Sequence, residues 1–228
     1  MKQFRHHVRA GAAACALALG LAFAWPALAS DEQTLIDHSV GTLQDLRHDK
    51  EFGNARELLN RARAVLIAPR IFKAGFFFGG EGGQAVLMVR GRGGWSDPAF
   101  YQIASASFGL QIGAQSSEMI MFIMSDRALH AVMSDRFKIG ADAGIAVATL
   151  GSEVGGATTG NVGADIVVWA SSSGAYAGIS LNGSVIEPMK QGDANYYGRP
   201  VTTGDIVLRR AVRAPGAAPL VHTIDSLT

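Results

Sequence analysis

The sequence predicts an α+β domain in which N-terminal helices pack on a strongly curved antiparallel β-sheet. Near the start of the chain, apolar residues recur three and four positions apart, as they do in amphipathic helices. From residue 64 onward, short β-prone runs are separated by glycine, as strands are. No repeat of 20 to 50 residues is detectable, which argues against a solenoid. Whether the sheet closes into a barrel is left open.

Residues 31–47 are expected to form the first helix, because Leu35, Ile36, Val40, Leu43 and Leu46 fall on one face. Asn54 is expected to cap a second helix that runs to Ala62, and Ser125 or Asp126 to cap a third one over residues 126–133. Two short helices are expected at residues 193–197 and 203–210.

The expected strands are bounded by glycine, proline or charged residues. The last two are expected to form an antiparallel hairpin across residues 172–174. The tail beyond Arg213 contains Pro215, Gly216 and Pro219 and is expected to be loose. The strands cover residues 64–68, 75–78, 85–90, 100–112, 119–124, 139–150, 166–171 and 176–181.

The first 29 residues have the pattern of a cleavable export signal. Lys2, Arg5 and Arg9 precede an uncharged stretch that ends in Ala27, Leu28 and Ala29, so cleavage is expected before Ser30. An uncleaved membrane anchor is the alternative, since the apolar stretch comes close to the length that spans a bilayer. The protein is therefore expected in the periplasm or at an envelope membrane.

Cys15 is the one cysteine of the chain, and it lies inside the signal. Lipoprotein anchoring through Cys15 is the less favoured reading, because lipidated cysteines usually follow the apolar stretch. The mature chain then has no thiol, and its stability must come from its core. The expected division is a signal peptide at residues 1–29, a helical segment at 30–53, one domain at 54–213 and a loose tail at 214–228.

Catalytic and metal-binding patterns are mostly missing from the sequence. The histidines of the mature chain, at positions 38, 48, 130 and 222, are widely separated, so no metal centre is expected. The residues from Gly80 to Ala85 match a dinucleotide-binding spacing, but a strand follows them instead of a helix, which favours a simple turn. No cofactor is expected, and no serine lies in a Gly-x-Ser-x-Gly elbow.

The charge pattern is more informative. Without Lys2, Arg5 and Arg9, the 20 Lys and Arg become 17 against 19 Asp and Glu, a formal charge of −2, which argues against a protein that coats nucleic acid. Residues 54–92 nevertheless hold seven basic residues against only two acidic ones, Glu57 and Glu81. Three consecutive phenylalanines lie in the same region.

Basic residues beside apolar rings meet the physical requirements for peripheral binding to an anionic membrane. The competing interpretation is that the cations are merely solvated and that helices bury the rings on both faces. The expected headgroup contacts are Arg61, Arg63, Arg70, Lys73, Arg90 and Arg92, and the expected apolar insertion uses Phe76, Phe77 and Phe78.

Several segments together resemble the SYLF domain family, from about Arg56 to Arg210. The chain departs from the family pattern at residues 150–153, where a Gly-Pro-x-Gly type turn is expected. The matching segments are residues 64–69 with 73–75, the glycine turn that leads into residues 86–90, Trp95-Ser96-Asp97-Pro98, Gly109-Leu110-Gln111-Ile112-Gly113, residues 177–183, and Asn195-Tyr196-Tyr197-Gly198.

The resemblance implies phospholipid binding, with phosphoinositides as ligands of eukaryotic members, through basic residues and an amphipathic helix near the domain start. Carried over by position, this indicates Lys73 with its neighbours and the helices before Ala64. Trp95, Gln111 and Tyr197 are expected to be structural. Actin is an unexpected partner for an exported protein, so anionic phospholipid such as phosphatidylglycerol or cardiolipin is the expected ligand. The rival hypotheses are an envelope lipid hydrolase and an adaptor that binds another envelope protein.

Overall fold

The protein is described here from a computed structural model that covers residues 31–76, 78–108, 113–140, 144–150, 163–173 and 183–228. For residues 73–76, 78–79, 106–108, 113–115 and 172–173 only the backbone is described. Its helices are α1 (Asp31–His48), α2 (Phe52–Arg61), α3 (Asp126–Val132), α4 (Lys190–Tyr197), α5 (Thr203–Val207), η1 (Pro215–Ala217) and α6 (Ala218–Ser226). Its strands are β1 (Ala64–Phe76), β2 (Phe78–Gly91), β3 (Gly94–Trp95), β4 (Ala99–Phe108), β5 (Gly113–Ile123), β6 (Phe137–Lys138), β7 (Val147–Thr149), β8 (Ile166–Ser173) and β9 (Val185–Pro188).

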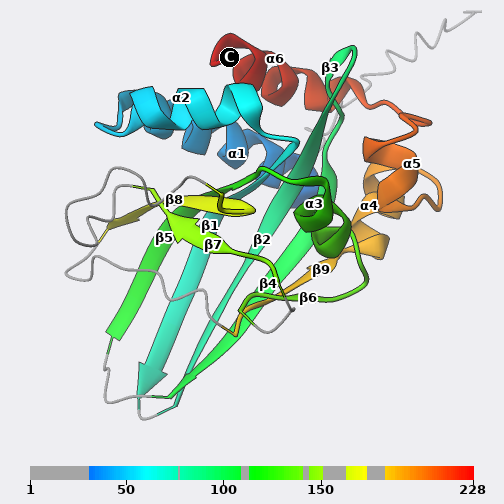
Figure 1. Cartoon of the computed structure of the whole chain (residues 1–228). Helices are drawn as coiled ribbons and strands as arrows, with labels where there is room; N and C mark the ends of the chain where they lie inside the picture. The colour runs from blue at the N-terminus through cyan, green and yellow to red at the C-terminus, as the bar shows by residue number, and fades with distance from the viewer. Residues whose placement is uncertain (1–30, 77, 109–112, 141–143, 151–162, 174–182) are drawn as a thin grey trace, which may run out of the picture.

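The architecture confirms the predicted α+β class. One curled sheet has the strand order β6-β9-β4-β2-β1-β5-β8-β7, and β3 pairs with β2 beside it. In the described strands the order is an open path, because its end strands β6 and β7 do not pair with each other. The sheet is mixed rather than purely antiparallel, since β7 runs parallel to β8. Figure 1 shows α1, α2 and α6 stacked at one end of the long strands.

Two apolar cores lie on the two faces of the sheet. Leu66 of β1 packs in the core beneath α3 and α5, whereas its neighbour Ile67 packs in the core beneath α1, α2 and α6. Both residues are fully buried. A strand that is buried on both faces needs a continuous apolar run, which explains why residues 64–68 show no polar alternation.

The structure corrects several boundaries. α2 starts at Phe52, and Asn54 does not cap it; its side chain donates to the Glu51 carboxylate at 2.9 Å instead. The strand expected over 139–150 is only β7 in the described residues, because Gly140 and Gly144 have positive φ angles that break an extended run. Ser125 caps α3 as expected, by accepting from the Ala128 N–H. The strand expected at 176–181 lies outside the described residues.

The prediction of a loose C-terminal tail is wrong. Pro219 lies in the first turn of α6, where its missing N–H leaves no hydrogen bond unmade. The helix then buries Leu220, Ile224 and Leu227 in the same core as α1. Pro215 lies at the start of η1 and Pro219 at the start of α6, so the two prolines begin helical segments instead of preventing them.

A β-bulge divides β1 into two halves. Two residues of β1 lie opposite one residue of β2 between the pairs Ile67↔Val86 and Arg70↔Gln84, and the register with β5 shifts at the same place. Pro69 falls in this bulge, where a residue without an N–H is tolerated. Beyond it, β1 and β2 continue as one hairpin, so the predicted runs 64–68 and 75–78 are parts of a single strand pair.

Candidate functional site

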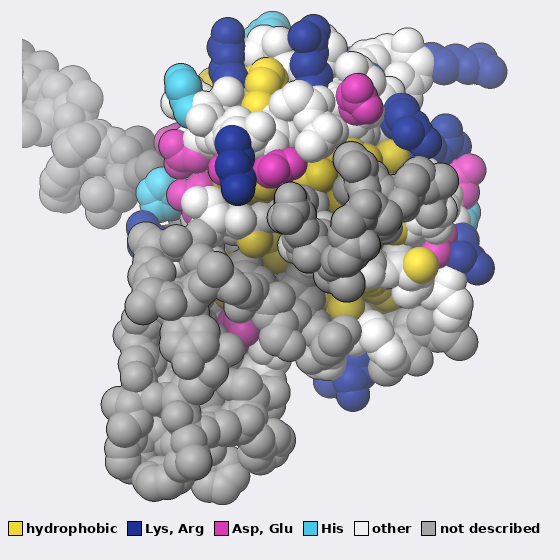
Figure 2. Space-filling model, turned by 60° about the vertical axis from the view of Figure 1, so that its left-hand side comes forward, with side chains coloured by type: hydrophobic (Ala, Val, Ile, Leu, Met, Phe, Trp, Pro, Cys, Tyr) yellow, Lys and Arg dark blue, Asp and Glu magenta, His cyan; other side chains and the backbone are white. Residues whose placement is uncertain are grey.

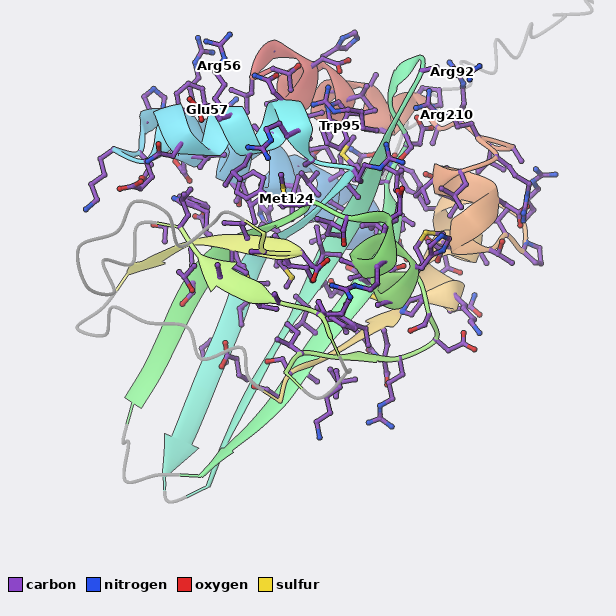
Figure 3. All side chains as sticks on the ribbon, viewed as in Figure 1. Arg56, Glu57, Arg92, Trp95, Met124 and Arg210 are labelled. Carbon is purple, nitrogen blue, oxygen red and sulfur yellow. The ribbon has the colours of Figure 1, made fainter. Side chains whose placement is uncertain are left out.

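The expected cations separate into two groups along β1. Arg61, Arg63, Arg90 and Arg92 lie where α2 enters β1 and where β2 turns into β3, together with Arg56 and Arg210. We call these six arginines the basic end. Figure 3 shows Arg56, Arg92 and Arg210 at this end of the molecule, and Figure 2 shows Lys and Arg side chains gathered over the helices there.

Arg90 is committed to structural contacts within the basic end. Its Nη2 donates to the carbonyl oxygen of Leu59 at 2.6 Å, near the C-terminus of α2, where a positive charge is favourable. Its guanidinium lies 4.5 Å from the ring centroid of Trp95, in cation–π contact. Burial lowers the pKa of Arg90, although the nearby Asp225 opposes this shift. Arg90 therefore joins α2 to β3 and presents little of its charge to solvent.

The other arginines of the basic end differ in how free their guanidinium groups are to bind a ligand. Arg63 donates to Asp126 at 2.7 Å in an ion pair whose partners are both more than half exposed, so water weakens it. Arg210 donates through Nη2 to the Gly94 carbonyl at 2.5 Å and holds the β2–β3 turn. Arg56, Arg61 and Arg92 are exposed, and no ion pair holds them within the described part of the chain.

Acidic side chains also lie at this end. Glu57 follows Arg56 on α2, Asp126 pairs with Arg63, and Asp225 lies near the β2–β3 turn. The six arginines thus lie together in a chain that has 20 Lys and Arg against 19 Asp and Glu. Arg56 and Arg61 are held by α2 and Arg90 by β2, whereas Arg63, Arg92 and Arg210 lie in the turns and loops that adjoin these elements.

Arg70 lies apart from the basic end, at the bulge. It lines an open groove of about 390 Å³ between the start of α1 and the β1–β2 hairpin. The α1 side of the groove is formed by Asp31, Thr34, Leu35 and His38, and the strand side by Pro69, Arg70, Phe72, Gly82, Gly83 and Gln84. The structure thus places one of the six expected headgroup residues in a separate concave site.

The far half of the hairpin carries the other expected residues. Lys73 pairs in register with Glu81, and Phe76 pairs with Phe78, which in turn pairs with Phe108. The side chains of Lys73, Phe76 and Phe78, and all of Phe77, lie outside the described residues. Ala64 and Phe76 are 12 residues apart on one strand, so roughly 40 Å separates the basic end from this row. The basic end and the phenylalanines therefore do not form one continuous site.

Phe72 is a surface residue that the sequence reasoning missed. Its side chain is 52% exposed, which is unusual for a phenylalanine in a nine-stranded sheet. Its neighbours in register are Gly82 on β2 and Ser116 on β5, and neither can cover a ring from the side. A phenylalanine flanked across the sheet by small residues is the signal that could have found it.

The N-terminal amphipathic helix is not free to bind a ligand through its apolar face. Leu35, Ile36, Leu43 and Leu46 of α1 are buried in the core on that side of the sheet. None of the described helices is both long and apolar enough to cross a bilayer.

The aromatic residues of the motifs that the structure describes belong to the core or pack against it. Trp95 is 4% exposed, and the Tyr197 hydroxyl donates to the Pro98 carbonyl at 2.7 Å. Tyr196 packs edge to face against both Phe100 and Tyr197, with centroid distances of 5.1 Å. These contacts are typical of structural residues, as expected for Trp95 and Tyr197. Gln111 lies outside the described residues.

Two carboxyl groups have raised pKa values. Asp193 of α4 is 1% exposed and accepts from the Phe100 N–H at 2.8 Å, and burial raises its pKa to about 7. Burial also raises the pKa of Glu118, and the nearby Asp45 adds to the shift. Neither carboxyl lines the groove, and no three His, Cys, Asp or Glu side chains converge as metal ligands in the described residues.

Comparison of the sequence with known proteins identifies a family. A family model described as "Ysc84: Las17-binding protein actin regulator" matches residues 104–227. Protein YSC84 of Saccharomyces cerevisiae is 28% identical over 174 residues, which cover 74% of this chain and 37% of the yeast protein. The human SH3 domain-containing YSC84-like protein 1 is 29% identical over 160 residues, 69% of this chain and 47% of the human protein. LAS seventeen-binding protein 3 of yeast is 26% identical over 174 residues, 75% of this chain and 38% of that protein.

The chain thus spans less than half the length of these relatives. The family model covers more than half of the chain, and the SYLF resemblance names the same family. The chain belongs to the Ysc84 (SYLF) domain family.

Proposed function

We propose that this chain is an exported, non-catalytic protein that binds anionic phospholipid at a membrane surface through its basic end. The observation that carries the proposal is the concentration of six arginines at one end of a chain whose basic and acidic residues are nearly equal in number. Each Lys or Arg close to an anionic membrane surface contributes about 1 kcal/mol of binding free energy. The exposed Arg56, Arg61 and Arg92 would together contribute a few kcal/mol at low salt.

The proposed contact between the basic end and a membrane is mainly electrostatic. The backbones of Phe76 and Phe78 lie at the opposite end of the β1–β2 strand pair, so a flat membrane surface in contact with the basic end does not reach them. Their insertion into a bilayer is a separate mode, which requires the molecule to face the membrane in another orientation. The export signal directs the proposal to phosphatidylglycerol or cardiolipin rather than to phosphoinositide.

Sedimentation with vesicles tests the proposal. The purified protein should sediment with vesicles that contain phosphatidylglycerol, and the bound fraction should fall steeply as salt screens the charges. Vesicles of phosphatidylcholine alone should retain much less protein. Binding that is equal for both vesicle types and insensitive to salt would contradict electrostatic anchoring. Turnover of phospholipid during the incubation would contradict a non-catalytic role.

The family description favours a second candidate, which is binding to another protein. That description names Las17 as a protein that is bound and actin as what is regulated, and an arginine-rich surface also suits an acidic protein partner. A stoichiometric partner from the envelope, together with no affinity for any vesicle, would favour this candidate over lipid binding.

A further inference from the structure

The groove beside α1 has features that its role in the fold does not require. Its volume of about 390 Å³ is within the range of small-molecule sites. One wall is the face of α1 that carries Asp31, Thr34 and His38, spaced three and four residues apart, and the opposite side is the β1–β2 hairpin.

The two glycines in the groove have different reasons to be glycine. At Gly83, a Cβ atom would overlap with the carbonyl oxygen of Arg70, because the bulge brings the two backbones together. At Gly82, a Cβ would make only ordinary contact with the Ile103 oxygen at 3.5 Å, and its φ angle is not in the left-handed region. The fold itself therefore accepts a side chain at position 82, and the glycine there keeps the groove open.

The charges of the groove are complementary to a zwitterion. Asp31 and Arg70 both line it, yet no ion pair joins them to each other or to any other described residue. An arginine is suited to a phosphate, and a carboxylate is suited to an ammonium group. The half-exposed ring of Phe72 adds an apolar surface, which also attracts a quaternary ammonium group.

From these features we infer that the groove binds a single zwitterionic phospholipid, with its phosphate at Arg70, its ammonium group at Asp31 and its apolar part against Phe72 and Gly82. This site is separate from the basic end and adds headgroup selectivity to the proposed membrane binding. It does not depend on that binding, since a phospholipid monomer in solution can occupy it.

Amide NMR spectroscopy with a soluble short-chain lipid tests this site. Dihexanoylphosphatidylcholine, used below its micelle concentration, should cause saturable shifts of the Thr34, Leu35, Gly82 and Gly83 amide signals. The anionic dihexanoylphosphatidylglycerol has the same chains, and it should bind at least about fivefold more weakly because Asp31 repels it. The headgroup compound glycerophosphocholine should bind more weakly than the lipid, because it lacks the chains that contact Phe72.

Variants at Gly82 and Gly80 distinguish an effect on the groove from an effect on the fold. Gly82→Val fills the groove and should weaken binding at least about tenfold. Gly80→Val is the matched control, because position 80 is on the same strand, outside the groove, with no atom within 4 Å of its Cβ. It should bind like the wild type. The inference is overturned if the groove amides show no saturable shifts, if Gly82→Val binds as tightly as the wild type, or if both dihexanoyl lipids bind equally well.

Discussion

The two halves of β1, on either side of the bulge at Pro69, have different surroundings. Before the bulge, residues 64–68 are fully buried between two cores and lead directly from the basic end. After it, Phe72 is half exposed, and glycines of β2 lie opposite the strand. One continuous strand therefore supports a charged surface at one end and an open, small-residue surface at the other. A site deduced from sequence proximity alone merges the two.

We expect a substitution in the buried half of β1 to destabilise the protein much more than a substitution in the exposed half. Leu66→Ala, in the buried half, should lower the free energy of unfolding by about 2–5 kcal/mol, because it leaves a cavity in the core. Phe72→Ala, in the exposed half, removes a larger side chain but should change the free energy of unfolding by less than about 1 kcal/mol. Urea denaturation of both variants measures this. A loss for Phe72→Ala as large as that for Leu66→Ala would show that Phe72 is also part of the core.

A smaller effect on the free energy of unfolding is expected at Asp193, which anchors α4 to the part of the sheet that contains the buried half of β1. Asp193 accepts from the backbone of Phe100, which lies opposite Val86 and hence in the same row as Ile67. The pKa of Asp193 is raised to about 7 in the folded protein, so the folded state binds the proton more tightly than the unfolded chain, whose value is near 4. The contribution of Asp193 to stability is therefore largest below about pH 4 and falls as the pH rises toward 7, by up to about 1.4 kcal/mol per pH unit.

Asp193→Asn isolates this contribution. The asparagine keeps an oxygen that can accept from the Phe100 N–H, but it does not ionise. The difference in unfolding free energy between the wild type and Asp193→Asn, measured in urea at pH 5 and pH 8, should shift in favour of the variant at the higher pH. A difference that does not change with pH would show that Asp193 is ionised in the folded protein without a penalty.

Much of the fold was predictable from the sequence. The spacing of Leu35, Leu43 and Leu46 indicates α1, and Ser125 at the start of α3 is a recognisable cap. The C-terminal α6 was not predictable in this way, because Pro215 and Pro219 were interpreted as breakers, although proline also starts helices. Its stability comes from Leu220 and Ile224, which pack on parts of the chain far away in sequence.

The site was predictable in its residue types and not in its arrangement. The excess of arginine over residues 54–92 correctly indicates a basic surface. Its separation from Arg70 and the phenylalanines depends on the length of β1, which the short predicted runs concealed. Arg90 shows the same difficulty, because its contacts with Leu59 and Trp95 arise only when α2 and β3 meet. The exposure of Phe72 depends on which residues are opposite it across the sheet.

Charge reversal at the basic end tests the central claim most directly. The double variant Arg61→Glu with Arg92→Glu should lose at least about tenfold in its partitioning onto phosphatidylglycerol vesicles, since two attractive charges become repulsive. The control is Arg136→Glu with Lys190→Glu, which makes the same change in net charge away from the basic end, at two exposed ion pairs. The account predicts that this control sediments with the vesicles nearly as well as the wild type. Equal losses in both double variants, or no loss in either, would contradict the assignment of membrane binding to the basic end.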